Sequence, residues 1–212
     1  DFPHTMLRAK AIQYKTGKMK FRDKLLTSTE LVGTLSSIPV VAQVVNAANK
    51  FGPARAVLQK ALGVDARREL PEFDSSNFRA DSTASYNHPV KDGKLSPGKV
   101  AVFSTCYVNY NEPGLGHDLL KLLDHNEIPY VVVKGETCCG MPKLELGDLD
   151  TVEKYKERNI PLMHDLAQAG YAIVTPVPSC TLMFKSEIPL LFPDDARCKA
   201  VSAAMYDPFE YF

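Results

Sequence analysis

The chain has 212 residues, 45% of them hydrophobic and 24% charged, which excludes fibrous and disordered classes and suits one globular domain with attachments or two small domains. No segment reaches the roughly 18 unbroken apolar residues that cross a bilayer, so we expect no membrane-spanning helix in it. The formal net charge is +0, but the charges are unevenly distributed. Up to Leu95 there are 15 basic and 9 acidic residues, and after it there are 10 basic and 16 acidic residues.

Residues 1–70 are predicted to form a mainly helical arm. Apolar residues recur at helical spacing over Met6–Tyr14, Leu25–Leu35 and Val40–Ala48. Such short helices cannot bury their apolar faces alone, so we expect the arm to pack on the rest of the chain or on another subunit. The arm also carries a run of basic residues: Arg8, Lys10, Lys15, Lys18, Lys20, Arg22 and Lys24. This run suits a membrane surface, a partner subunit or a solvated face, and the lack of RNA-binding or helix-turn-helix motifs argues against a nucleic-acid partner.

The rest of the chain divides into a linker and a second domain. Residues 71–98 are rich in Ser, Asn, Asp, Gly and Pro and are predicted to form a linker that is ordered by docking. In residues 99–212 short apolar runs alternate with helical stretches. The predicted strands are Val100–Ser104, Ile128–Val133 and Tyr171–Thr175, and the predicted helices are Gly116–His125, Leu149–Ala169, which Pro161 should kink or split, and Thr181–Leu191. This alternation indicates an α/β fold with a Rossmann-like parallel sheet and helices on both faces.

The five cysteines all lie in this second domain. They are odd in number and no secretory signal precedes them, so we expect a reducing, cytoplasmic setting. Cys106 follows the first predicted strand, Cys138 and Cys139 follow the second, and Cys180 follows the third. Because the carboxyl ends of parallel strands share one edge, these four thiols are predicted to converge there. Cys198 lies outside this pattern and is predicted to be an ordinary thiol.

Four converging thiolates are soft ligands and favour zinc or an iron–sulfur cluster. The adjacent Cys138 and Cys139 would crowd a single tetrahedral ion, whereas they reach different irons of a cluster more readily. Gly140 directly after them permits a backbone conformation or a close approach that a side chain would block. A cluster is therefore the favoured cofactor. No nucleophile–base pair can be assembled from spacing, so we predict no catalytic residue.

The pattern of Cys106, then 31 residues, then Cys138-Cys139-Gly140-Met141-Pro142, then Pro178-Ser179-Cys180 resembles the cysteine-rich CCG domain. That domain occurs in the B subunit of heterodisulfide reductase, in the C subunit of anaerobic glycerol-3-phosphate dehydrogenase and in glycolate oxidase iron–sulfur subunits. The resemblance covers about residues 99–192 and implies an iron–sulfur electron-transfer subunit of a multi-subunit oxidoreductase. It further implies other subunits as partners, among them a flavoprotein dehydrogenase, and a peripheral position on the inner face of the cell membrane.

One departure from the family pattern bears on the cluster. The family ends this motif with C-x-x-C, but here Cys180 is followed by Thr181, Leu182 and Met183. Four thiolates, those of Cys106, Cys138, Cys139 and Cys180, remain and suffice for a [4Fe–4S] centre. Met183 is expected to pack in the core rather than to bind iron.

Two other interpretations stay open. In the first, the chain is a cluster-free or zinc-binding interaction domain that acts as a scaffold. In the second, Cys138 and Cys139 catalyse thiol–disulfide exchange, although a disulfide between neighbouring cysteines closes a strained ring. The chain opens at Asp1 without an initiator methionine and ends on the apolar-rich run Asp207–Phe212, and both ends look like interior sequence of the long family members. We therefore expect a piece of a longer polypeptide.

Overall fold

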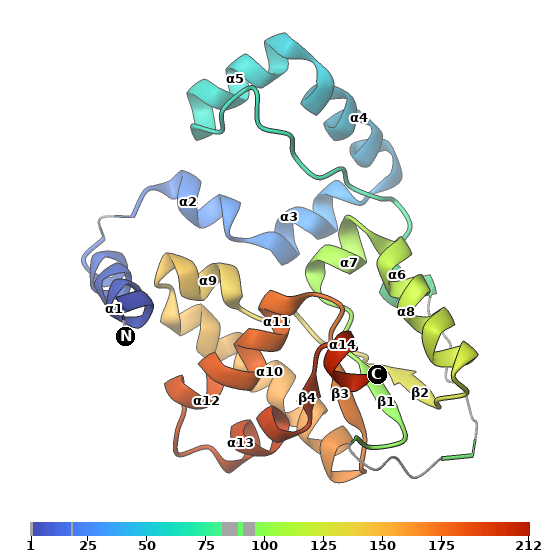
Figure 1. The fold of residues 1–212 in the computed structure, drawn as a ribbon. Helices are drawn as coiled ribbons and strands as arrows, with labels where there is room; N and C mark the ends of the chain where they lie inside the picture. Colours follow the sequence, from blue (N-terminus) through green and yellow to red (C-terminus); the bar gives the residue numbers. More distant parts are fainter. Residues whose placement is uncertain (1, 18, 82–88, 91–95) are drawn as a thin grey trace.

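The computed structural model describes residues 2–17, 19–81, 89–90 and 96–212 (Figure 1). Five helices form the predicted N-terminal arm: α1 (Phe2–Lys15), α2 (Phe21–Leu26), α3 (Thr29–Ser36), α4 (Pro39–Lys50) and α5 (Gly52–Leu62). The single stretch predicted over Leu25–Leu35 is in fact two helices. The break arises because the hydroxyls of Thr27 and Ser28 donate to the carbonyls of Asp23 and Lys24, at 3.0 and 2.8 Å, and so compete with helical bonding.

The sheet has four parallel strands in the order β2-β1-β3-β4. Its strands are β1 (Val100–Val102), β2 (Tyr130–Val132), β3 (Ala172–Val174) and β4 (Met205–Tyr206). The first three lie within the predicted strands, and β1 and β3 are buried along their whole length because helices cover both faces. The two-residue strand β4 was not predicted.

Helices cover both faces of the sheet, as predicted (Figure 1). After the arm come the short helix α6 (Phe78–Asp81) and then α7 (Cys106–Tyr110), α8 (Pro113–His125), α9 (Met141–Leu146), α10 (Leu149–Gln168), α11 (Pro178–Leu182), α12 (Ile188–Leu191), α13 (Ala196–Ala203) and α14 (Pro208–Tyr211). One core cluster packs α8 against the side chains of Val100, Val102 and Val174. The other packs α10 and α13 against the opposite face, around Ile173.

Two helix predictions need correction. α10 continues through Pro161 as one helix rather than splitting there, and Ile160 just before the proline and Met163 two residues after it are fully buried, which anchors both halves in the core. The helix predicted from Thr181 begins earlier, at Pro178. Its middle, Met183–Glu187, is a π-helical segment, a form that occurs as single turns within α-helices.

The region predicted as a linker contains the short helix α6 (Phe78–Asp81). Phe78 is fully buried, and a Cβ at Gly116 of α8 would lie 2.6 Å from its ring, so this contact requires glycine. The linker prediction for residues 82–88 and 91–95, and the basic residue Lys18, fall outside the described residues.

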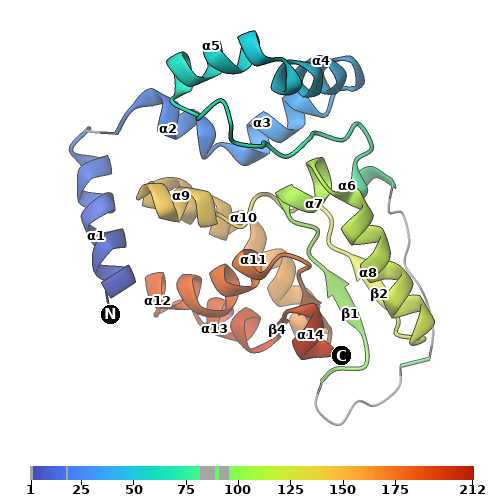
Figure 2. The same cartoon turned by 45° about the horizontal axis from the view of Figure 1, so that its top comes forward.

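The arm lies across the carboxyl edge of the sheet. Figures 1 and 2 both show α2 and α3 above α7 and α9, with α4 and α5 further out. α1 packs on α9 and α3 packs on α7, so part of the arm packs on the rest of the chain, one of the two expected arrangements. Among the described helices none alone has the length and hydropathy to span a membrane, and only the pair α3 and α4 passes such a test together, bent by 106°.

Candidate functional site

Four thiols meet at the carboxyl edge of the sheet. Cys106 begins α7 after β1, Cys138 and Cys139 lie in the loop between β2 and α9, and Cys180 lies in α11 after β3. The strand order puts β1 between β2 and β3, so the three loops that carry sulfur are neighbours. The structure thus brings the four predicted site residues together in space.

The thiols form two close pairs. The Sγ atoms of Cys106 and Cys138 are 4.0 Å apart, and those of Cys139 and Cys180 are 3.1 Å apart. Cys138, Cys139 and Cys180 are only 1%, 3% and 4% exposed, and Cys106 is half-buried. In the part of the chain that the structure describes, no group of three or more His, Cys, Asp or Glu side chains is arranged to hold a metal ion as it stands. The sulfurs are therefore gathered as two close pairs rather than as a cage for one ion.

The Cys138 thiol has a lowered pKa. It accepts hydrogen bonds from the Cys106 and Cys139 thiols, and also from the Thr29 hydroxyl and the Gly140 N–H, and together these lower its pKa in spite of burial. The Cys106 and Cys139 thiols each donate a hydrogen bond to the Cys138 sulfur, and these bonds, together with burial, raise the pKa of both thiols.

The pKa directions of Cys106, Cys138 and Cys139 bear on whether a metal ion or cluster fits the site. The protein's own donors stabilise one thiolate, so additional ionised sulfurs in this buried space need a bound cation. Four soft sulfur donors suit iron or zinc and not the hard cations magnesium and calcium. The donor set therefore fits the metal group that the sequence predicts.

Two backbone positions beside the thiols have positive φ. Gly140 has φ of 98°, and a Cβ there would lie 3.4 Å from the terminal methyl of Met183, so this position favours glycine on both counts. Thr105, next to Cys106, has φ of 69°, a conformation that costs about 1–3 kcal/mol in a residue other than glycine. Its hydroxyl accepts a hydrogen bond from the Val108 N–H at 3.3 Å, which caps α7 and helps to hold the turn.

Asn159 of α10 fixes the loop that leads into Cys138. Its side-chain oxygen accepts from the Thr137 N–H at 2.9 Å, and its amide nitrogen donates to the carbonyls of Thr137 and Cys138 at 3.3 and 3.0 Å. Asn159 is 1% exposed, so these bonds satisfy backbone groups that water does not reach. Sequence analysis missed this residue, although a lone Asn on the apolar face of a helix is a signal of such a role.

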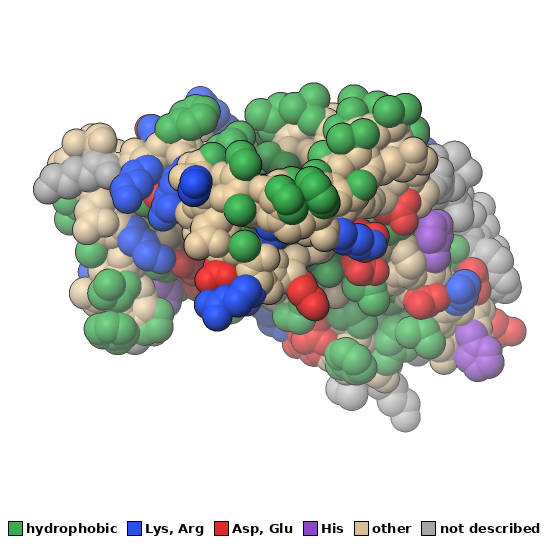
Figure 3. Space-filling view, turned by 90° about the horizontal axis from the view of Figure 1, so that it is seen from above, with side chains coloured by type: hydrophobic (Ala, Val, Ile, Leu, Met, Phe, Trp, Pro, Cys, Tyr) green, Lys and Arg blue, Asp and Glu red, His purple; other side chains and the backbone are tan. Residues whose placement is uncertain are grey.

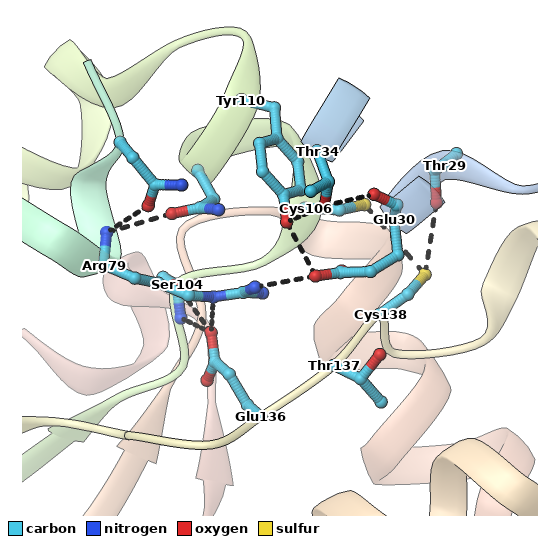
Figure 4. Close-up of polar contacts among 12 residues, drawn as sticks. Thr29, Glu30, Thr34, Arg79, Ser104, Cys106, Tyr110, Glu136, Thr137 and Cys138 are labelled. Atoms are coloured by element: carbon cyan, nitrogen blue, oxygen red, sulfur yellow. Dashed lines mark hydrogen bonds and ion pairs between the residues drawn. The ribbon is translucent and has the colours of Figure 1, made fainter. Parts of the chain in front are cut away.

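A buried ion-pair network joins the arm, α6 and the sheet edge (Figure 4). Arg79 donates from Nε to Glu136 and from Nη1 to Glu30, both at 2.9 Å. Glu136 also accepts from the Ser104 N–H at 3.0 Å and contacts the Ser104 hydroxyl, and the Tyr110 hydroxyl donates to Glu30 at 2.7 Å. Burial raises the pKa of Glu136 to about 7 against the opposing effect of Arg79. Burial also disfavours the charge of Arg79, but the two carboxylates outweigh this and raise its pKa.

The arm contacts the cysteine loop at two further points. Thr29 Oγ1 lies 3.4 Å from Cys138 Sγ. Lys143 Nζ donates to Ser28 Oγ at 2.9 Å and to the Lys24 carbonyl at 3.4 Å, and its side chain is only 7% exposed. Neither contact was predicted, because each joins segments far apart in the sequence. A buried lysine in particular cannot be identified without its tertiary partners.

Cys198 and Met183 occupy the places expected of packing residues. Cys198 is fully buried in α13, where burial raises its pKa to about 11. Met183 is fully buried in the core cluster that contains Cys138, Cys139 and Cys180. A flexible thioether in this position fills space beside the thiols.

Comparison with known proteins identifies relatives of this site. Residues 100–185 match the CCG family, described as a cysteine-rich domain. The chain is 32% identical over 185 residues to the C subunit of anaerobic glycerol-3-phosphate dehydrogenase of Escherichia coli (strain K12), which covers 86% of this chain and 44% of that protein. It is 29% identical over 137 residues to the B subunit of fumarate reductase (CoM/CoB) of Methanothermobacter marburgensis, covering 64% of this chain and 27% of that protein.

A third relative is an uncharacterized iron-sulfur protein of Methanocaldococcus jannaschii, 30% identical over 79 residues, which cover 37% of this chain and 16% of that protein. The chain thus spans less than half the length of each of these three relatives. No solved structure matches it significantly.

Proposed function

We propose that this chain, whose residues 100–185 belong to the cysteine-rich CCG family, is the iron–sulfur electron-transfer part of a multi-subunit oxidoreductase. The observation that carries this proposal is the gathering of four thiols, from three strand ends, where three are buried in one cluster and the half-buried Cys106 packs against it. The names of the relatives support it, since they are subunits of a dehydrogenase and a reductase and an iron-sulfur protein. The finer form of the proposal is a [4Fe–4S] centre in a protein of the heterodisulfide reductase type or of the type of the glycerol-3-phosphate dehydrogenase C subunit.

In this proposal Cys106, Cys138, Cys139 and Cys180 hold the cluster, which supplies reversible one-electron transfer when bound. The chain's own contribution is to fix the ligands and to keep water out. Phe103 and Phe184, both fully buried, pack edge to face in the same core cluster with ring centroids 5.0 Å apart. A dry surround of this kind tunes the potential of a metal site. Chemistry at an organic substrate belongs to a partner subunit, for which a flavoprotein dehydrogenase is our proposal.

Iron and acid-labile sulfide content after anaerobic purification tests this function. We expect roughly four irons and four sulfides per chain, the content of a [4Fe–4S] cluster. Cys138→Ser should lose most of the iron because it removes a ligand. Cys198→Ser is the matched control and should keep full iron content, since Cys198 is a buried thiol that lies outside the ligand set. One zinc per chain, or no metal, would instead support the scaffold alternative.

We further propose that α4 and α5 contact the inner surface of the cell membrane. Between Glu30 and Asp65 the sequence contains no acidic residue. Figure 3 shows hydrophobic side chains gathered over this face, with Lys and Arg side chains beside them. The exposed apolar residues on it are Ile38 (49%), Val40 (70%), Val44 (63%), Phe51 (61%) and Val57 (66%). An exposed apolar face with no negative charge suits the interfacial region of an anionic bilayer.

Flotation with lipid vesicles tests the membrane contact. Vesicles that contain phosphatidylglycerol should bind the chain more strongly than vesicles of phosphatidylcholine alone. Val44→Asp should weaken binding because it places a negative charge in the apolar face. Leu122→Asp is the control, since Leu122 is 51% exposed on α8, away from this face. Equal binding by both variants, or no binding by the unaltered chain, would refute the proposal.

A further inference from the structure

We propose that Thr29 is a positioning residue of the cysteine site, whose hydroxyl donates a hydrogen bond to the sulfur of Cys138 and raises the reduction potential of the bound cluster. The inference rests on the proposed iron–sulfur function. Its basis is a contact between segments far apart in the sequence, because Thr29 belongs to the helical arm and Cys138 to the loop after β2. The two atoms, Oγ1 and Sγ, are 3.4 Å apart (Figure 4).

Anchors on both sides hold Thr29 in place. Ser28, the residue before it, accepts a hydrogen bond from the buried Lys143 at 2.9 Å. Glu30, the residue after it, accepts one from Arg79 at 2.9 Å. Thr29 therefore cannot move along the site without breaking a charged contact on one side or the other.

The same anchors are tied to the loop that carries Cys138. Lys143 lies a few residues after Cys138 in the chain, and Glu136, which pairs with Arg79 at 2.9 Å, lies two residues before it. Ser28 and Glu30 flank Thr29, while Lys143 and Glu136 flank the thiol that Thr29 touches. Two polar links, one on each side of Thr29, thus set the register of the arm against the loop that carries Cys138, with Thr29 opposite Cys138.

The chemistry follows from the charge on the sulfur. Adding an electron makes a thiolate-ligated cluster more negative, so a donor to a ligating sulfur stabilises the reduced form more than the oxidised form. Hydrogen bonds to charged acceptors are also stronger than those between neutral groups. Cys138 is 1% exposed, so water has little access to replace a lost donor. Removing the hydroxyl should therefore make the potential more negative.

The test is an anaerobic redox titration of the iron-loaded chain with dithionite, followed by electron paramagnetic resonance. Thr29→Val keeps the shape of the side chain and removes the donor, and it should shift the midpoint potential to a more negative value. Thr29→Ser keeps the hydroxyl and should restore a potential close to that of the unaltered chain. Thr16→Val is the matched control, because the Thr16 hydroxyl, just after α1, donates to the Gln13 carbonyl 3.1 Å away and not to a cysteine among the described residues, so it should cause no shift.

The outcomes separate this inference from the proposed function. An unaltered chain without iron and sulfide would overturn both. Full iron content in every variant, with the Thr29→Val potential unchanged, would overturn the role of Thr29 alone. A shift of equal size in Thr29→Ser or Thr16→Val would also overturn it, because the hydroxyl at Thr29 would not be the cause.

Discussion

Replacing Arg79 with methionine removes the centre of the buried ion-pair network. The Arg79 side chain is 18% exposed, and its partners Glu30 and Glu136 are 24% and 0% exposed. Arg79 is the only cation with an ion pair to either carboxylate among the described residues. Without it, the donors that Glu136 keeps among the described residues are the Ser104 N–H and hydroxyl. The variant therefore leaves the Glu136 carboxyl group buried with no opposite charge among the described residues, so it must either stay charged without a partner or take up a proton.

The expected loss of unfolding free energy is large because Arg79→Met removes one partner of the ion pair and leaves the other, Glu136, fully buried. Removing one partner of a buried ion pair typically destabilises a protein by about 3–5 kcal/mol, and we expect Arg79→Met to lie in this range. Glu136→Gln in the same chain removes the charge that lacks a partner. The double variant should therefore recover at least about 1.5 kcal/mol, a coupling of the size expected for residues in direct contact.

Urea denaturation followed by circular dichroism gives the free energy of unfolding for each variant. The matched control is Lys121→Met, which breaks an ion pair of equal length, 2.9 Å, whose side chains are 76% and 69% exposed. An exposed pair contributes at most about 1 kcal/mol, so this variant should unfold much like the unaltered chain. Equal losses for Arg79→Met and Lys121→Met, or no recovery in the double variant, would refute the account of the network.

Three further predictions concern the surroundings of the site. Asn159→Ala should lower the free energy of unfolding by about 2–3 kcal/mol in the same denaturation assay, because it leaves buried backbone groups unpaired. Asn126→Ala is the control: it removes an exposed bond to the Leu122 carbonyl and should cost under about 1 kcal/mol. Cys198, fully buried and with a pKa raised to about 11, should resist iodoacetamide at pH 8 in the native chain and react on unfolding; rapid labelling of the native chain, seen by mass spectrometry, would contradict this. The pKa of Asp195 is lowered by Arg197 and by Lys156, so its carboxylate contributes stability above the unfolded pKa of about 4 and loses it as the pH falls. Asp195→Asn should therefore cost about 1 kcal/mol at pH 7 and progressively less below pH 4, and a constant difference across pH would exclude the charge as its source.

Much of the second domain could be predicted because its signals are local. Val100, Ala101 and Val102 form a continuous apolar run, which is the pattern of a parallel strand that is buried on both faces. Once three such strands are recognised, their carboxyl ends must share an edge, and the thiols that follow them must lie near one another. β4 gave no such signal, because two residues are too few for a recognisable pattern.

The contacts of the arm could not be predicted, because none of them leaves a local pattern. Glu30 and Arg79 lie far apart in sequence and look like ordinary surface charges until the fold brings them together at 2.9 Å. The break after α2 depends on the Thr27 and Ser28 hydroxyls, whereas the apolar spacing on either side reads as one helix. Lys143 is a residue type that is almost always exposed, and its burial is explained by partners that the fold supplies, Ser28 and the Lys24 carbonyl in the arm and the carboxylate of Asp148.

The charged residues under the arm contribute more to register than to net stability. Burying an ion pair removes two charges from water, and the attraction between them recovers little more than that loss, so an apolar contact of similar volume would hold the arm at least as firmly. An apolar contact is not directional, however, and would tolerate a shift of α3 along the site. The bonds of Arg79 and Lys143 to the arm have fixed donors and acceptors on both sides of Thr29, and a shift of one residue would break the Arg79–Glu30 and Lys143–Ser28 bonds in a largely buried place. Placing a hydroxyl opposite the Cys138 sulfur needs this directionality, which is why the network is polar although the thiols beside it lie in an apolar cluster.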